Sequence, residues 1–318
     1  MLTLERASKT YRVGAFGGGR LVAVRDADFS IAQGEVVSLI GESGSGKSTI
    51  GRMILRLISV NGGRITLDGD DIAALRGPAL RAYYRVVQGV FQDPFSSFNP
   101  IFKVDHAFSL LRGLHGGGLA DEAWRLRVDE ALASVGLEGG QVLHKYPHQL
   151  SGGQLQRVLI ARALLLDTRF LVADEIISML DASTRIDVLN LLGDLKARGL
   201  GILFITHDLS LANYISERAI ILRRGRVVES GPTRAVFENP LHPYTQQLLG
   251  AVPRLHEKWG TGPRSGKADA CCYHDAITTT HETGLPAMVE AEPGHFVGCA
   301  NLYGVCPGDT GAVVRATA

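Results

Sequence analysis

The chain has 318 residues, of which 45% are hydrophobic, and its formal net charge is only +1. That length and apolar content can bury a sizeable core, enough for one large domain with an appendage. The near-neutral charge gives no support to a nucleic-acid partner, and no apolar run reaches the roughly 18 residues of a membrane-spanning helix.

The first residues are expected to form a β-strand, because residues 1–6 alternate between apolar and polar side chains. They lack the apolar core of a signal peptide. We therefore expect a cytosolic protein whose membrane attachment, if it has one, comes through partner subunits.

A strand, a glycine-rich loop and a helix follow in this order. The apolar run Val36–Ile40 predicts a buried strand, and apolar residues recur at helical spacing from Ile50 to Leu57. Between them lies Gly41–Ser48, with the sequence GESGSGKS. Such a loop directs backbone N–H groups and a helix N-terminus at one point, which suits a polyphosphate. The alternative is a glycine-rich turn that binds nothing.

Several residues of this loop have expected roles. Lys47 is expected to reach the β- and γ-phosphates of a nucleotide, and the Ser48 hydroxyl to bind Mg²⁺. Thr49 is expected to add a phosphate contact. The nucleotide-binding residues predicted in this segment are Gly41, Ser43, Gly44, Ser45, Gly46, Lys47, Ser48 and Thr49.

A helical insertion is predicted after a second apolar strand at residues 86–91. The segment 92–100 contains two prolines and paired small polar residues, which indicate a loop. Apolar residues then recur at helical spacing from Trp124 to Val135, and Asp121 is placed to cap that helix. We expect residues 101–163 to form helices within an α/β domain, with a flexible turn in the glycine run between them.

Two later apolar strands end in polar side chains. One leads into Asp174 and Glu175, and the other leads into His207. Ligands collect at the carboxyl ends of strands in open parallel sheets, so these side chains are expected at the same edge as the phosphate loop. Asp174 suits Mg²⁺, Glu175 suits polarising the attacking water, and His207 suits a γ-phosphate contact. The alternatives are a solvated acidic strand end and a structural histidine.

The remainder of the chain is expected to add a hairpin and a tail. Apolar residues on both sides of Arg223–Arg226 indicate a hairpin turn. The tail, from about residue 241 onward, contains several glycines and prolines and all 4 cysteines. That placement argues against a disulfide framework and towards a local site or none.

These motifs together resemble an ATP-binding cassette (ABC), the nucleotide-binding subunit of ABC transporters. Leu150–Gln154, with the sequence LSGGQ, matches the signature motif of that family, and Ser178–Asp181 resembles its D-loop. The resemblance implies an α/β fold of the P-loop NTPase type with an antiparallel β portion. It places the ABC domain at residues 1–240, with its helical subdomain at 101–163, and a C-terminal extension at residues 241–318.

The resemblance also implies which residues act in the reaction. Tyr11 is expected to stack on adenine, and Gln92 to sense Mg²⁺ as the glutamine of the Q-loop. The catalytic residues that it implies are Glu175, His207 and Gln92. The residues that it implies for Mg²⁺ are Ser48, Gln92 and Asp174.

In this family the signature motif caps the γ-phosphate bound to the opposite subunit of a dimer. The residues expected at that composite site are Ser151, Gly153, Gln154 and Asp181. The alternative for Ser151 is that it only caps the helix that follows. One position departs from the family pattern, because Ile176 follows Glu175 where many members have proline. We expect this exchange to change loop dynamics without loss of hydrolysis.

Further segments narrow the resemblance to the ATPases of oligopeptide and dipeptide importers. They are residues 91–100, residues 239–249 and a tail segment that ends near residue 299. The resemblance implies an ATPase that uses ATP and Mg²⁺ on the cytoplasmic face of a membrane. Its expected partners are a second ATPase subunit, two permease subunits and an extracytoplasmic substrate-binding protein. Phe95 and Phe98 are expected to receive a short permease helix.

Other functions stay in view. The same subfamily includes ATPases for nickel and oligosaccharide uptake, because cargo specificity lies in other subunits. Soluble ABC proteins of DNA repair carry a long coiled coil or zinc modules between the phosphate loop and the signature, whereas this gap holds a compact helical insertion. Translation-type ABC proteins normally have two cassettes, and this chain has one phosphate loop.

A metal centre in the tail is a further hypothesis. Cys272 and Cys299 resemble the first and last members of a four-cysteine motif that holds a 4Fe-4S cluster in some peptide-importer ATPases. The two middle cysteines are missing at their usual places. A cluster or a zinc ion would need Cys271 and Cys306 to fold back, with His274, His281 and His295 as alternative ligands. The alternative is a set of free thiols.

Overall fold

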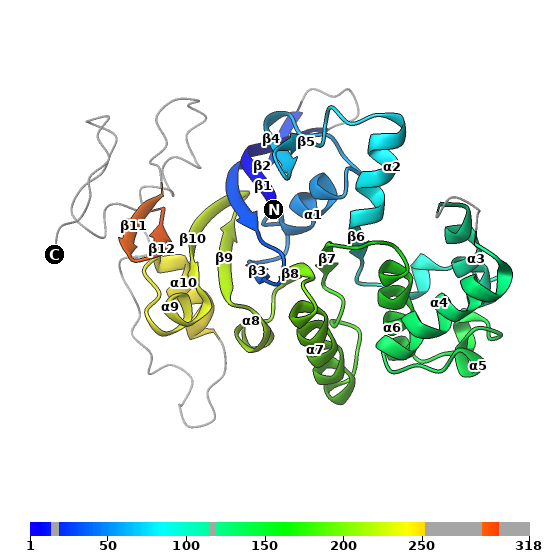
Figure 1. Ribbon diagram of the computed structural model, residues 1–318. Helices are drawn as coiled ribbons and strands as arrows, with labels where there is room; N and C mark the ends of the chain where they lie inside the picture. Colours follow the sequence, from blue (N-terminus) through cyan, green and yellow to red (C-terminus); the bar gives the residue numbers. More distant parts are fainter. Residues whose placement is uncertain (14–18, 115–118, 252–287, 299–318) are drawn as a thin grey trace.

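The computed structural model describes residues 1–13, 19–114, 119–251 and 288–298. Its described residues form two β-sheets, several helices that cover them, and a group of helices at one end (Figure 1). No helix among these residues is long and apolar enough to cross a bilayer.

The smaller sheet is antiparallel and contains the N-terminal strand. Its strands run in the order β2-β1-β4-β5. Their bounds are β1 Leu2–Val13, β2 Gly19–Ile31, β4 Gly62–Leu67 and β5 Asp70–Asp71. Alternate residues of β1, such as Leu2 and Leu4, are fully buried, which is the period-2 pattern of a strand with one face on the core. The expected N-terminal strand is confirmed.

The larger sheet has eight strands in the order β11-β12-β10-β9-β3-β8-β7-β6. The strands from β9 to β6 pair in parallel, and β10, β12 and β11 continue the sheet in antiparallel pairs. The parallel strands are β3 Val36–Ile40, β6 Val87–Val90, β7 Phe170–Asp174, β8 Gly201–Thr206 and β9 Arg218–Arg223. The antiparallel strands are β10 Arg226–Pro232, β11 Val289–Glu292 and β12 His295–Val297.

Both faces of the parallel strands are covered, so β3, β7 and β8 are buried along their whole length and mostly apolar. On one face, Leu39 and Val172 pack with α1 (Lys47–Ile54) and the smaller sheet. On the other, Phe204 and Leu171 pack with α6 (Gly152–Leu164) and α7 (Ala182–Ala197). The remaining helices of this part are α2 Gly77–Val86, α8 Leu209–Ile215, α9 Thr233–Glu238 and α10 Pro243–Gly250.

Most of the expected insertion, residues 101–163, is helical in the structure. It contains α3 Val104–Leu114, α4 Asp121–Ser134, α5 Gly139–Val142 and α6, with the short 3₁₀ turn η2 Pro147–Gln149. A further 3₁₀ turn, η1 Phe95–Ser97, precedes it. Trp124, Val128 and Leu132 form the buried stripe of α4, as their spacing predicted. Asp121 does not cap the helix: Ala120 is the N-cap, and Asp121 begins the first turn, where its carboxylate pairs with Arg112.

The predicted hairpin turn at residues 223–226 joins β9 to β10. Arg224 and Gly225 both have positive φ, at 46° and 83°, as a tight two-residue hairpin turn of the primed type requires. Beyond residue 240, α10 packs on the core beside β9 and β10, and the β11–β12 hairpin adds to the edge of the larger sheet. The described part of the expected C-terminal extension is therefore continuous with the sheet that carries the phosphate loop.

Candidate nucleotide site

The phosphate loop connects β3 directly to α1, as the sequence predicted. Gly44 and Gly46 have φ of +80° and +105°, in the left-handed region that side chains disfavour. A Cβ on Gly41 would lie 2.2 Å from the backbone oxygen of Leu222. Glycine is therefore needed at 41 for close packing on β9, and at 44 and 46 for the path of the loop.

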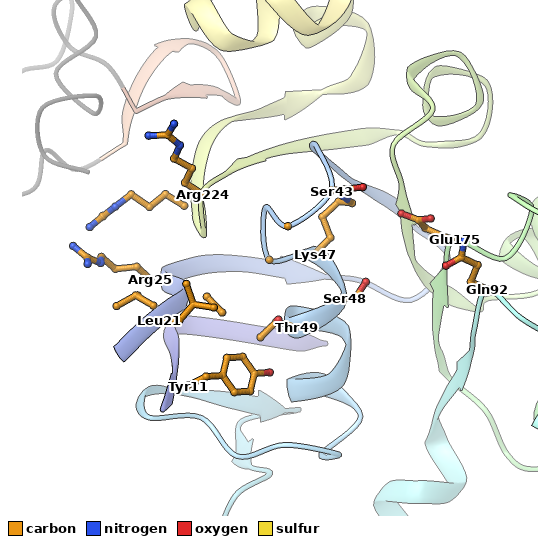
Figure 2. Close-up of a pocket in the computed structure, with 15 residues that line it drawn as sticks. Tyr11, Leu21, Arg25, Ser43, Lys47, Ser48, Thr49, Gln92, Glu175 and Arg224 are labelled. Atoms are coloured by element: carbon orange, nitrogen blue, oxygen red, sulfur yellow. The ribbon is translucent and has the colours of Figure 1, made fainter. Parts of the chain in front are cut away.

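A pocket of about 770 Å³ opens between this loop and the smaller sheet. Figure 2 shows Gln92 and Glu175 on one side of the loop, and Arg25 and Arg224 on the other. The predicted site residues that line it are Tyr11, Ser43, Gly44, Gly46, Lys47, Ser48, Thr49, Gln92 and Glu175. The structure thus gathers predicted residues from four separate segments of the chain around one cavity.

Lys47 is held within the loop. Its Nζ donates to the backbone oxygens of Gly41 at 2.7 Å and Glu42 at 2.9 Å. Burial lowers the pKa of Lys47, and the nearby carboxylates of Glu175, Asp174 and Glu42 oppose this shift. The ammonium group therefore sits in a partly dehydrated position, where an anionic ligand would interact strongly with it.

Ser48 and Asp174 form a pair of oxygen donors beside the loop. The Ser48 hydroxyl donates to Oδ1 of Asp174 at 3.1 Å, and Asp174 is only 7% exposed. Burial raises the pKa of Asp174, since the carboxylate loses hydration there. A divalent cation would offset that cost, and Mg²⁺ prefers oxygen ligands. The donor set therefore fits Mg²⁺, with the Gln92 side chain on the same side of the pocket.

Glu175 and His207 lie together at the ends of β7 and β8. Nδ1 of His207 is 3.3 Å from Oε1 of Glu175. The backbone of Glu175 has a φ of +52°, which is uncommon outside glycine and is often found at functional sites. Its N–H donates to the backbone oxygen of Ile205 at 2.9 Å. The strand ends thus deliver a carboxylate and an imidazole to the same edge.

The signature residues do not line this pocket. Ser151 caps α6: its Oγ accepts from the Gln154 N–H at 3.1 Å, and the Gln154 side chain accepts from the Ser151 N–H at 3.0 Å. A Cβ on Gly153 would lie 2.4 Å from Cγ2 of Thr184, so α6 and α7 pack closely there. Asp181 caps α7 through the Thr184 N–H at 3.0 Å. Within one chain, these residues shape two helix N-termini.

The remaining predicted residues have supporting positions. Ser45 is buried and lies outside the pocket lining, while its backbone oxygen accepts from the Gly225 N–H at 2.8 Å. Sequence reasoning missed the wall opposite Gln92, which strand β2 and the β9–β10 turn provide. The lining residues that it missed are Leu21, Val22, Ala23, Arg25, Arg224 and Arg226. The arginine-rich turn at residues 223–226 is visible in the sequence. The sequence does not show that this turn lies beside the phosphate loop.

The two phenylalanines of the loop after Gln92 differ. Phe95 is 46% exposed, whereas Phe98 is 8% exposed and packs in the core of the helical part. The expectation that both rings receive a partner is therefore wrong for Phe98, because the apolar interior of the insertion already covers it. Ile101 and Phe102, which the sequence analysis did not select, are 76% and 43% exposed just beyond it.

The tail cysteines lie outside the described residues, as do His274 and His281. Among the residues that the structure describes, no group of three or more His, Cys, Asp or Glu side chains is arranged to hold a metal ion. His295, named as an alternative ligand, is fully buried, with Nε2 at 2.8 Å from Oε1 of Glu229. Its ring is already engaged within the protein.

Comparisons with known proteins agree with this geometry. Residues 24–178 match the family described as ABC transporter, and residues 228–275 match the oligopeptide/dipeptide transporter C-terminal region. AmiF of Streptococcus pneumoniae, an oligopeptide transport ATP-binding protein, is 43% identical over 289 residues, which cover 89% of this chain and 91% of AmiF. The chain belongs to the ABC transporter ATPases. OppF of Streptococcus pyogenes, another oligopeptide transport ATP-binding protein, is 42% identical to this ATPase over 294 residues, with 89% and 91% of the two chains covered.

Solved structures confirm the fold of the ATPase. A dimeric ATP-binding cassette in a post-hydrolysis state, bound to ADP and Pi, superposes with a TM-score of 0.66 and 31% identity over 74% of this chain and 99% of that one. CbiO1 from Clostridium perfringens, part of an ABC transporter complex, superposes with a TM-score of 0.65 and 28% identity. The match covers 75% of this chain and 90% of CbiO1. The expected P-loop ABC fold and ATP hydrolysis are therefore confirmed.

Proposed function

We propose that this ATPase powers the import of oligopeptides or dipeptides. The observation that carries the proposal is the match of residues 228–275 to the C-terminal region of oligopeptide/dipeptide transporters. The names of AmiF and OppF support the same cargo class. Nickel or oligosaccharide uptake is the alternative, because an ATPase subunit does not itself contact the cargo.

The pocket supports a division of work among its residues. Tyr11 stacks on adenine, and the N–H groups of the phosphate loop with Lys47 bind the phosphates. Ser48, Asp174 and Gln92 would hold Mg²⁺, which would neutralise phosphate charge. The remaining nucleotide contacts come from Gly41, Ser43, Gly44, Ser45, Gly46 and Thr49.

Hydrolysis is assigned to the pair at the strand ends. Glu175 accepts a proton from the attacking water and orients it towards the γ-phosphate. His207, which lies 3.3 Å from that carboxylate, orients it and contacts the γ-phosphate. Gln92, in the loop that follows β6, lines the pocket and would contact the metal from there. The positive φ of Glu175 supports a role in which its exact orientation matters.

The signature residues act on a second subunit in this proposal. Ser151, Gly153, Gln154 and Asp181 lie outside the lining of their own chain's pocket, although they match motifs that complete an ATP site in a dimer. One related structure is a dimer of such cassettes. Two subunits would close on two ATP molecules and reopen after hydrolysis.

A permease contact is proposed at the loop that follows Gln92. Phe95, Ile101 and Phe102 expose apolar surface within eight residues of one another, and such patches often mark protein contacts. Two permease subunits would hold the ATPase at the cytoplasmic face of the membrane, and an extracytoplasmic binding protein would deliver the cargo.

Transport by the assembled system tests the proposal. The ATPase would be reconstituted in liposomes with its permeases and binding protein, and uptake of labelled peptides, Ni²⁺ and oligosaccharides compared. ATP-dependent peptide uptake that disappears with Lys47→Ala supports the proposal. Uptake of Ni²⁺ or oligosaccharide alone contradicts the peptide assignment and leaves the transport ATPase intact.

A further inference from the structure

The C-terminal part of the chain contacts the phosphate loop through one tyrosine. Tyr244 stands in the first turn of α10 and is 3% exposed. Its hydroxyl oxygen accepts a hydrogen bond from the backbone N–H of Glu42 at 3.2 Å. Burial raises the pKa of Tyr244, so the phenol stays neutral. A residue 202 positions later in the sequence thus holds the second residue of the loop.

This hydrogen bond fixes a peptide group whose carbonyl oxygen also accepts a hydrogen bond from Lys47. In a trans peptide the N–H and the C=O point in opposite directions. The plane between Gly41 and Glu42 has its N–H on Tyr244 and its C=O on the Lys47 ammonium at 2.7 Å. Rotation of this plane would therefore move the carbonyl that positions Lys47.

Tyr244 itself makes two further contacts. The guanidinium of Arg223 lies 4.8 Å from the centre of the Tyr244 ring. The backbone N–H of Tyr244 donates to Nδ1 of His242 at 3.0 Å. The chain that enters α10 is fixed by Glu229, whose carboxylate accepts from the N–H groups of Leu241 at 2.8 Å and His242 at 3.0 Å.

The anchor extends to the C-terminal hairpin. The same Glu229 carboxylate contacts Nε2 of His295 on β12 at 2.8 Å, and both side chains are fully buried. Breaking a buried hydrogen bond leaves a polar group without its partner, so this contact ties the hairpin to β10. A continuous series of hydrogen bonds therefore runs from β12 through Glu229 and the start of α10 to the phosphate loop.

We propose that Tyr244 is a positioning residue for nucleotide binding, and that the Glu229–His295 pair keeps it in place. The C-terminal segment then sets the affinity of the phosphate loop for MgATP by fixing the Gly41–Glu42 peptide. The proposal rests on the phosphate-binding role given to Lys47. The C-terminal segment thereby acts on nucleotide binding.

Removal of one hydroxyl group tests the proposal in the full-length chain. Tyr244→Phe keeps the ring beside Arg223 and removes only the contact with Glu42. It should raise the Kd for a non-hydrolysable MgATP analogue about two- to tenfold, the range expected for one hydrogen bond. The KM for ATP should rise similarly with kcat nearly unchanged, and the melting temperature should stay within a few degrees of wild type. Tyr214→Phe is the matched control, since that hydroxyl bonds Asn190 on the surface and should leave Kd unchanged.

Lys47→Ala separates the possible failures. If it abolishes binding while Tyr244→Phe binds like wild type, the proposal for Tyr244 is overturned and the nucleotide site stands. If Lys47→Ala also binds like wild type, the site and the proposal fall together.

A double-mutant cycle tests the anchor. His295→Gln should raise Kd in the wild-type background and have little further effect in the Tyr244→Phe background, because both changes release the same peptide. Equal effects of His295→Gln in the two backgrounds, or no effect in either, would show that the hairpin does not act through Tyr244.

Discussion

Replacement of Glu175 by glutamine removes the proposed base with little change of shape. The Glu175 side chain is 17% exposed and lies 3.3 Å from His207, so an amide of the same size can occupy the site and keep that contact. It cannot accept a proton from water. General-base catalysis contributes about 10²–10⁴-fold in rate, or about 3–5 kcal/mol of barrier. Turnover should fall by a factor in that range.

Binding should respond differently, because the exchange removes one negative charge near the phosphates. MgATP should bind at least as well as in wild type, and the variant should accumulate as an ATP-bound dimer. Phosphate release would be measured with the permeases present, and dimer formation by light scattering. Glu130→Gln, an exposed carboxylate on α4, is the control and should hydrolyse normally. Turnover of Glu175→Gln within a few-fold of wild type would refute its role as base.

Three further predictions concern the helical part and the helix caps. Ser151→Ala should leave nucleotide binding to the monomer intact and suppress ATP-driven dimerisation in light scattering; equal loss of both would contradict a site completed by the partner. Phe98→Ala should destabilise the fold by about 3–5 kcal/mol in denaturant unfolding, whereas Phe95→Ala should stay within about 0.5 kcal/mol and reduce permease assembly. Hydrogen bonds from Ser183 and Thr184 lower the pKa of Asp181, so its carboxylate stabilises α7 above about pH 4 and loses this effect as pH falls further. The destabilisation caused by Asp181→Ala should accordingly be larger at pH 7 than at pH 3; a pH-independent difference in melting temperature would contradict the cap.

The sequence was sufficient for the parallel strands and the phosphate loop. Gly201–Ile205 is a continuous apolar run and Val36–Ile40 is interrupted only by Ser38, because both faces of these strands are buried, and that pattern is local. The loop needs glycine at positions with positive φ, so the glycine pattern of the sequence also predicts its backbone conformation. The polar residues after each strand could then be assigned to one edge.

Contacts between distant segments could not be predicted in this way. Nothing in the local pattern distinguishes Phe95 from Phe98, because burial depends on how η1 packs against the helical insertion. The β9–β10 turn was predicted as a hairpin, yet its bond from the Gly225 N–H to Ser45 depends on the order of strands in the sheet. The same is true of His295, whose partner Glu229 lies 66 residues earlier.

The departure at Ile176 shows how a packing contact can replace a covalent restraint. A proline at this position would stiffen the backbone after Glu175 through its ring. Ile176 is 1% exposed and packs in the core between the larger sheet and the helical part, and Ile177 is 3% exposed. Glu175 is also held on its other side by the backbone bond to Ile205. Burial on one side and a hydrogen bond on the other hold the backbone on both sides of Glu175, so we expect hydrolysis to proceed without the proline.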